Sequence, residues 1–599
     1  MRGLLLATVF GFIITGCQSA TPPVRAGLAR PVVGTGAIHA LRPIVPEDIP
    51  PAPIPAIPLP KVWTTPEANK PWPLSLREAV LIALRNSDII RTLQGDQVVA
   101  SGVSNYDPSV LDASWRATGA IFDPTLRIGY IADKYNQPPS TFFGPGLAEN
   151  TRRDDATLTA ALIKPWATGG STSIAYNPST GYLFFPQGSS GLFNPNYSSN
   201  IEISGRQPLL RGAGIDVNRA PIRIAQLQTG QSVWTVKQAT LSLVRSVEEA
   251  YWSLQAAHSA LQAVDDILPF IDDVVHIQEE RFEEERTIRA EVGKARAQQA
   301  TFRQSRINAR SEAVKQELLL RNLLGLAPDD GLTIVPTSPP SRVPLQLDSV
   351  ALMQIAVNNR PDLMRQRLGI RIREMELLVA ENGLKPQFDL QALYRTNGLS
   401  DNVGDSLSMT LQNQFTDWTA GATFSIPLGR RAARATLQAA ELVLGRERMV
   451  LRQQLHATAH RLGDLLRQLE AIRNSYDQAE IRVRETEEWL KGARGRYEDP
   501  PPGADGQDWL LLALNDYLLA LRTRADANTE IAQILARYNT LLATLEEAQG
   551  TLLASYEIVL EGDPILQARS SPLNIRSDLV EPLNWDLDAE NHHQNSVRK

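Results

Sequence analysis

Residues 455–490, LHATAHRLGDLLRQLEAIRNSYDQAEIRVRETEEWL, carry the pattern that decides the fold. Apolar or aromatic residues recur every seven positions, and a second series follows three residues after members of the first. A sustained seven-residue repeat is typical of helices that pack side by side with a left-handed supercoil. The first series is Leu455, Leu462, Leu469, Tyr476, Val483 and Leu490, and the second is Leu465, Ile472 and Ala479. The stretch therefore predicts an elongated helical bundle or tube.

Two long helical segments are predicted, over residues 218–324 and 432–560. Each is interrupted near its middle, the first by the charge-dense residues 279–288 and the second by residues 500–503, whose prolines must break a helix. We therefore expect two helical hairpins with arms of about 60 residues, or roughly 90 Å at 1.5 Å per residue. Pro269 is expected to kink the first arm.

The same order of elements is predicted twice along the chain. Ser75 and Glu78 form a capping box at the start of a short helix, and a β-like segment and a long helical segment follow. The short motif Pro73-Leu74-Ser75-Leu76 recurs as Pro344-Leu345-Gln346-Leu347. We therefore predict two tandem structural repeats, over residues 74–340 and 344–560.

The β-like segments lie at about residues 111–210 and 387–427, and they show weak alternation, as in 113–119, 157–162 and 200–204. No run after residue 14 is long and apolar enough for a transmembrane helix, so a chain that spans a membrane would need to form a β-barrel. Long polar loops and aromatic residues near strand ends are typical of outer-membrane barrels, although a soluble β-domain is the alternative.

A strand-exit pattern recurs three times, and its first copy contains Thr168-Gly169-Gly170, predicted to be a tight turn. This turn would give the first repeat four strands and the second repeat two. The alternative is that residues 157–177 fold over a loop without crossing the membrane.

The N-terminus predicts export. Arg2 precedes an apolar run at 4–14, which is too short to span a bilayer, and the only cysteine of the chain, Cys17, follows small residues. This arrangement resembles the lipobox of bacterial lipoproteins, so we expect a signal peptide at 1–16 and acyl chains on Cys17. An ordinary secretory signal with a chance cysteine is the alternative. A proline-rich linker is expected at 17–73, and a polar tail at 561–599.

The sequence predicts no enzyme, cofactor or metal site. It lacks nucleophile-elbow, Walker, zinc-protease and Cys-x-x-Cys motifs, and one cysteine excludes internal disulfides and thiolate cages. The net charge of −6 gives no electrostatic reason to expect nucleic acid. His456 and His460 lie four residues apart without an evident third ligand, so we interpret them as part of a solvated helix face.

The chain resembles the TolC-type outer-membrane efflux protein family, in its lipoprotein branch, over about residues 73–560. The resemblance depends on the paired helix starts, on Gln207 to Gly214, on Arg321 to Leu326 and on Ser425 to Arg430. It implies an α+β membrane protein, in which a homotrimer completes a transmembrane β-barrel that continues into a periplasmic tunnel of long α-helical hairpins. The familiar barrel has four strands per subunit, whereas the extra hairpin here predicts six per subunit and eighteen per trimer.

The resemblance also implies function and partners. It implies a passive exit duct of a tripartite efflux system in the outer membrane, coupled to a periplasmic adaptor and to an inner-membrane pump of RND or ABC type. The alternatives are type I protein secretion and a non-conducting structural coiled-coil lipoprotein.

The predicted functional residues lie at the two hairpin turns, which in this family form the periplasmic end of the tunnel. Three copies of an acidic turn would attract cations, although the charges could equally serve only to keep exposed turns soluble. The adaptor-contact residues are Glu285, Arg286, Thr287 and Ile288, and the acidic aperture residues are Glu498, Asp499, Asp505 and Asp508.

Overall fold

The computed structural model describes residues 70–137, 151–184, 193–343, 348–499 and 507–558, all within one compact unit. Several of the sequence predictions fall on the rest of the chain. The signal peptide, Cys17, the proline-rich linker up to residue 69, Asp505 and the polar tail all lie outside the described residues.

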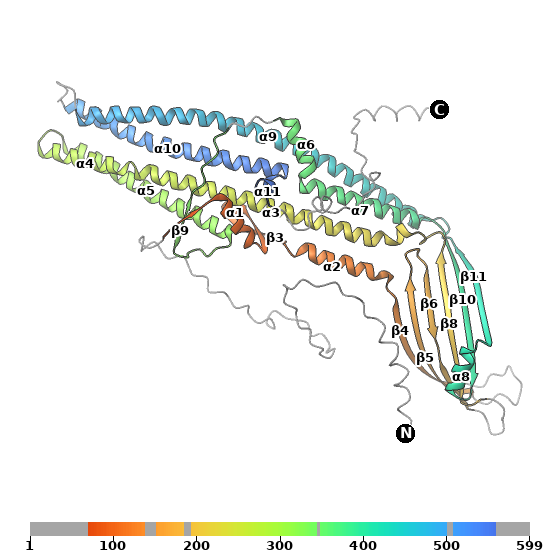
Figure 1. Ribbon diagram of the computed structural model, residues 1–599. Coiled ribbons are helices and arrows are strands. Elements are labelled where there is room, and N and C mark those ends of the chain that lie inside the picture. The colour runs from red at the N-terminus through yellow and green to blue at the C-terminus, as the bar shows by residue number, and fades with distance from the viewer. Residues whose placement is uncertain (1–69, 138–150, 185–192, 344–347, 500–506, 559–599) are drawn as a thin grey trace, which may run out of the picture. The chain divides into compact units, whose positions relative to one another are not determined.

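The helical part contains the two predicted hairpins (Figure 1). The first consists of α3 (Ile215–Asp265), α4 (Leu268–Glu283) and α5 (Arg289–Leu324). The second consists of α9 (Arg431–Glu498) and α10 (Gln507–Gln549). Helix α3 packs against α5 and α10, and α9 packs against α10, so the two hairpins lie side by side. The arms are unequal, since α9 has 68 residues and α10 has 43.

The seven-residue repeat is confirmed as the packing surface of α9 in its middle part. Leu462, Leu465, Leu469 and Ile472 are buried in one cluster with Tyr538, Leu541 and Leu545 of α10. The remaining members of the first series, Leu455, Tyr476, Val483 and Leu490, are half-buried.

Two boundaries of the helices differ from the prediction. Pro269 does not kink a continuous helix, because α3 ends at Asp265 and α4 begins at Leu268 with the proline in its first turn. Proline fits that turn because its missing N–H would have no partner there. The last long helix ends at Gln549 rather than near 560, and Gly550 follows with a φ of +77°, a conformation that terminates helices.

The expectation of a strand at residues 113–119 is wrong, because α2 (Asp107–Gly119) covers them and packs against α3. Its alternating residues are mostly small, and Asp107-Pro108 is a favourable helix start. The capping box of α1 (Leu76–Arg85) is confirmed, with the Ser75 and Glu78 side chains each bonded to the other residue's backbone N–H.

Small elements tie the N-terminal region to the hairpins. Strand β1 (Lys70–Leu74) pairs in parallel with β9 (Leu332–Pro336), and β2 (Ile89–Gln94) pairs with β3 (Gln97–Ser104). The buried Tyr251 hydroxyl on α3 donates to the carbonyl of Leu74 at 2.9 Å and accepts from two backbone N–H groups that follow β9. In the second half, α6 (Ser349–Asn359) and α7 (Pro361–Gly383) precede the strands, and α11 (Leu552–Ser555) ends the described chain.

All the long strands belong to one antiparallel sheet, ordered β11-β10-β8-β6-β5-β4. Strand β7 occupies the same place as β6, because both pair with β5 and β8. The sheet is therefore six positions wide. The strands are β4 (Thr125–Gln137), β5 (Thr151–Pro165), β6 (Ser171–Tyr176), β7 (Ser179–Phe184), β8 (Asn196–Pro208), β10 (Gln387–Ser400) and β11 (Phe415–Ser425).

The extra hairpin predicted from Thr168-Gly169-Gly170 is confirmed as two paired strands. Two backbone hydrogen bonds close its turn. The N–H of Trp166 donates to the carbonyl of Gly170 at 2.8 Å, and the N–H of Gly169 donates to the carbonyl of Trp166 at 2.9 Å. None of the described helices combines the length and the apolar character that crossing a membrane requires.

Candidate functional site

One side of the six-position sheet is apolar and exposed, and we call it the apolar face. The pairing register places directly opposed residues on the same side, so every second residue of each strand belongs to this face. Trp418 is 75% exposed and Tyr130 is 68% exposed. A continuous apolar surface of this kind calls for apolar surroundings. The large members are Leu126, Ile128, Tyr130, Leu162, Ile174, Ile203, Leu390, Tyr394, Trp418 and Phe424.

The other side is polar and carries ion pairs between neighbouring strands. Arg206 on β8 contacts the buried carboxylate of Asp389 on β10 at 2.6 Å. Arg395 contacts Glu202 at 2.9 Å and Asp417 at 3.8 Å, which links β8, β10 and β11. An apolar side that alternates with a polar side is the pattern of a sheet with lipid on one side and water on the other.

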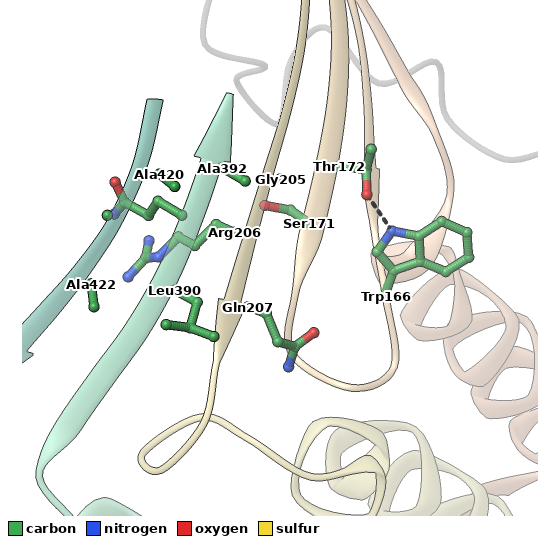
Figure 2. A pocket seen from close by; sticks show the side chains of 12 residues that line it. Trp166, Ser171, Thr172, Gly205, Arg206, Gln207, Leu390, Ala392, Ala420 and Ala422 are labelled. Carbon is green, nitrogen blue, oxygen red and sulfur yellow. Dashed lines mark hydrogen bonds between the residues drawn. The ribbon is translucent and has the colours of Figure 1, made fainter. Parts of the chain in front are cut away.

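Aromatic residues mark both ends of the apolar face. At the end nearest the helices, the rings of Phe388 and Phe424 have centroids 6.4 Å apart. Trp166 lies at the same end and donates from its indole N–H to the hydroxyl of Thr172 at 2.9 Å (Figure 2). At the other end lie Tyr394 and Trp418. Aromatic residues with one polar atom favour membrane–water boundaries.

A shallow hollow of about 680 Å³ crosses β6, β8, β10 and β11 beside Trp166 (Figure 2). Small residues leave this space open, because Gly205, Ala392, Ala420 and Ala422 have little side chain to fill it. The hollow lies mainly on the apolar face, and Arg206 reaches it from the polar side.

Strands β4 and β11 are the two edges of this sheet within the described residues. Each pairs on one side only, so its outer N–H and C=O groups lack a strand partner there. Unpaired edges of long strands are templates for pairing with another chain.

The junction between the sheet and α3 explains the Gln207 to Gly214 motif. The N–H of Gly212 donates to the Asn382 side chain at 2.7 Å, and Asn218 donates to the carbonyl of Gly212 at 2.9 Å. A Cβ atom on Gly169, whose φ is +93°, would lie 2.0 Å from the Gly212 carbonyl oxygen. The motif therefore holds the β5–β6 turn against the start of the first hairpin.

The first predicted tip is the turn between α4 and α5. Glu285 has a φ of +60°. The backbone N–H of Arg286 donates to the carbonyl of Arg281 at 2.7 Å, and the backbone N–H of Glu285 donates to the carbonyl of Phe282 at 3.1 Å. This is the helix-ending arrangement that usually places glycine at the position of Glu285. Glu285, Arg286 and Ile288 are exposed, and Thr287 is half-buried.

The second predicted tip is only partly described. Glu498 ends α9 and accepts from Arg494 at 2.7 Å, so much of its charge is balanced, and Asp499 is exposed beside it. Asp508 lies in the first turn of α10, and its side chain is outside the described residues. The described part therefore does not bring the four acidic residues together.

Three residues that the sequence analysis missed join the two tips, and we call Gln278, Arg281 and Tyr497 the tip cluster. Gln278 donates from Nε2 to the Tyr497 hydroxyl at 2.8 Å, and Arg281 donates from Nη2 to the Tyr497 carbonyl at 2.8 Å. The guanidinium carbon of Arg281 also lies 4.6 Å from the centre of the Tyr497 ring. All three are buried, and burial raises the pKa of the Tyr497 hydroxyl. No sequence pattern separates them from other polar residues of a helix surface.

Apolar packing surrounds the tip cluster. Tyr497 lies in a buried cluster shared by α4, α5, α9 and α10, and its ring centroid is 5.3 Å from that of Tyr517. A cavity of about 120 Å³ lies between the tip cluster, the first tip and α10. Among the described residues, Nη1 of Arg281 and Oε1 of Gln278 have no hydrogen-bond partner.

The described residues contain no group of three or more His, Cys, Asp or Glu that could hold a metal ion. The His456 and His460 rings contact each other edge to face, with centroids 4.5 Å apart, on an exposed surface of α9.

Comparison with known proteins gives a family match over part of the chain and the fold. Residues 169–326 match the family model described as outer membrane efflux protein, and no curated protein sequence matches the chain. The family is one of channels rather than enzymes.

Solved structures of outer membrane channels have the same fold. VceC of Vibrio cholerae is 17% identical with a TM-score of 0.54, over 79% of this chain and 96% of that one. CusC is 15% identical with a TM-score of 0.55, over 84% of this chain and 99% of that one. CmeC of Campylobacter jejuni is 14% identical with a TM-score of 0.53, over 80% of this chain and 86% of that one.

Proposed function

From the outer membrane efflux protein domain that residues 169–326 carry, we propose that three copies of this chain form a passive exit duct across the outer membrane. The observation that carries the proposal is the sheet with one apolar and one polar side. The apolar side would face lipid, and the ion pairs of Arg206 with Asp389 and of Arg395 with Glu202 would line the water-filled interior.

The edges of the sheet suit closure by subunit association. Each neighbouring pair of strands between β4 and β11 is antiparallel, so the two edge strands run in opposite directions. Strand β11 of one subunit can therefore pair with β4 of the next and continue the antiparallel pattern. Three subunits closed in this way leave no free edge.

The six positions per subunit set the width of the proposed barrel. With about 4.8 Å between strands and a tilt of about 40°, eighteen strands give a backbone diameter of roughly 36 Å, against roughly 24 Å for twelve. The duct is therefore wider at its membrane end than the four-strand resemblance implies.

The hairpins would form the periplasmic tunnel, and the tip cluster supplies a physical basis for a closed state. Opening the tunnel at its end requires the end of α9 to separate from α4. That movement breaks the contacts that Gln278 and Arg281 make with Tyr497. The mechanism is a change of helix packing, and it needs no chemical step.

The remaining assignments belong to the same proposal. Glu285, Arg286, Thr287 and Ile288 would contact a periplasmic adaptor, which would couple the duct to an inner-membrane pump of RND or ABC type. Glu498 and Asp499, with Asp505 and Asp508, would make the aperture favour cations. Acyl chains on Cys17 would hold the N-terminus at the membrane, and the proline-rich linker would join that anchor to α1.

The test is reconstitution of the purified mature protein in planar bilayers. Trimers that conduct, with eighteen strands in the barrel by cryo-electron microscopy, support the proposal. A soluble protein, or a membrane-bound one that never conducts under any voltage, overturns it and favours the structural lipoprotein. Twelve strands per trimer would overturn the wider barrel alone.

A further inference from the structure

A short helix, α8 (Val403–Leu411), connects β10 to β11 along the chain and lies on the apolar face of the sheet. We propose that α8 is an interfacial helix that binds lipid of the outer leaflet at the boundary between headgroups and acyl chains. This inference rests on the proposed function, because it needs the apolar face to be in the membrane.

Helix α8 is fixed to the sheet by polar contacts. The Ser199 hydroxyl on β8 contacts the hydroxyls of Ser406 at 3.0 Å and Thr410 at 2.6 Å, and Thr396 on β10 donates to the carbonyl of Thr410 at 2.8 Å. A Cβ atom on Gly398 would lie 2.1 Å from the carbonyl oxygen of Ser406. The helix therefore lies directly against β8 and β10, with Ser406 and Thr410 buried.

One flank of α8 is apolar and exposed, although the helix lies beside a sheet that could have covered it. The side against the sheet carries hydroxyl groups, while Val403 is 56% exposed and Leu411 is 66% exposed. Val403, Leu407 and Leu411 recur every four residues and form one stripe along the helix. A surface helix of a soluble protein buries such a stripe, so its exposure here indicates apolar surroundings.

The position of α8 along the strands identifies those surroundings. On β10 the apolar face ends at Tyr394, and the next residues on that side are Thr396 and Gly398, which lie under α8. The Tyr394 hydroxyl contacts Asn413, just after the helix, at 2.8 Å. Helix α8 therefore begins where the apolar band of the sheet stops, at the end far from the tunnel, which is the depth of the lipid headgroups.

Lipid fits this surface better than a second subunit does. In the proposed trimer, subunits would meet at the edge strands β4 and β11, whereas α8 contacts β8 and β10. Its N-terminal turn is also held by its own chain, since Asn402 accepts from the N–H of Asp405 at 2.8 Å. The apolar stripe is thus continuous with the membrane-facing side of the sheet and separate from the subunit contact.

The test uses an environment-sensitive fluorophore on the full-length channel in phospholipid vesicles. Leu411→Cys labels the stripe, Asp405→Cys labels the opposite side of the same helix, and the unsubstituted protein reports any labelling of Cys17. Quenching by lipids that carry a nitroxide near the headgroup should be about twofold or more stronger at 411 than at 405. Val403→Asp combined with Leu411→Asp should reduce the fraction of protein inserted into vesicles.

Equal quenching at both sites in channels that conduct would overturn the lipid contact and leave the duct intact. Protection of 411 from water without quenching by lipid would indicate a protein partner instead, and would also overturn it. Channels that fail to conduct before any substitution would count against the proposed function itself.

Discussion

Tyr497→Phe should open the channel, because it removes one oxygen atom from the tip cluster. In the wild type, the Tyr497 hydroxyl accepts from Gln278 at 2.8 Å, and Gln278 is 2% exposed. Without the hydroxyl, the buried amide N–H₂ group loses its acceptor. The ring itself keeps its packing against Tyr517 and Arg281.

The size of the effect follows from that unpaired group. A buried donor left without a partner costs about 1–3 kcal/mol in the closed state. If three subunits open together, the closed trimer loses about 3–9 kcal/mol relative to the open one. Since about 1.4 kcal/mol corresponds to a tenfold change in an equilibrium, even the lower limit predicts a rise of roughly a hundredfold in the open-to-closed ratio.

The assay is single-channel recording in planar bilayers, with Tyr476→Phe as the matched control. Tyr476 is half-buried on the same helix and lies outside the tip cluster, so its substitution should leave the open probability unchanged. Gln278→Leu combined with Tyr497→Phe should restore closure in part, because both polar groups are then removed together.

An unchanged open probability in Tyr497→Phe trimers would refute the reasoning. It would mean that α4 and α9 do not separate at Tyr497 when the tunnel opens. Equal opening by the Tyr476 and Tyr497 variants would also refute it, because the effect would then be general destabilisation of α9.

Three further outcomes follow from single residues. Glu285→Gly should stabilise the fold by about 0.5–1 kcal/mol in chemical denaturation, because a φ of +60° strains glutamate but not glycine. A lower denaturation midpoint for the variant would argue against this. Burial raises the pKa of Glu248 to about 7, so the folded state binds an extra proton between pH 4.5 and 7, and the stability of the wild type should fall as the pH rises through that range. Glu248→Gln should remove that fall and should be more stable than the wild type at pH 8 by up to about 3 kcal/mol. Thermal unfolding of both proteins at pH 5 and pH 8 tests this. Gly169→Ala should greatly reduce the yield of assembled trimer on native gels. Gly445→Ala, on an exposed position of α9 where an added Cβ meets nothing within 4 Å, should not, and equal yields would exclude tight packing at the β5–β6 turn.

Periodic features were predicted well because each residue reports on the same surface as its neighbours. The repeat on α9 identified Leu462, Leu465, Leu469 and Ile472 as packing residues before the partner helix was known. The capping box at Ser75 was predictable because its hydrogen bonds form within four residues. The alternation over 113–119 predicted a strand where the structure has a helix, because so short a run of mostly small residues fits a helix as readily as a strand.

The tip cluster could not be found from the sequence. Gln278 and Arg281 are polar residues on α4, and 216 positions separate Arg281 from Tyr497 along the chain. Only the packing of α4 against the end of α9 brings them together. The same holds for α8, whose serine and threonine look like a solvent-facing side until Ser199 is placed beneath them.

The sequence by itself determined the long helical hairpins, the extra turn at Thr168 to Gly170 and the two-sided character of individual strands. These are local properties, since they depend on spacing along one segment and on the conformations that each residue allows. Only the tertiary structure decided that the predicted extra hairpin takes its place inside the sheet rather than in a loop, that the apolar residues of the strands lie together on one side, and that Tyr497 joins the tips. Those features depend on pairing register and on contacts between distant segments, which residue spacing along one chain does not encode.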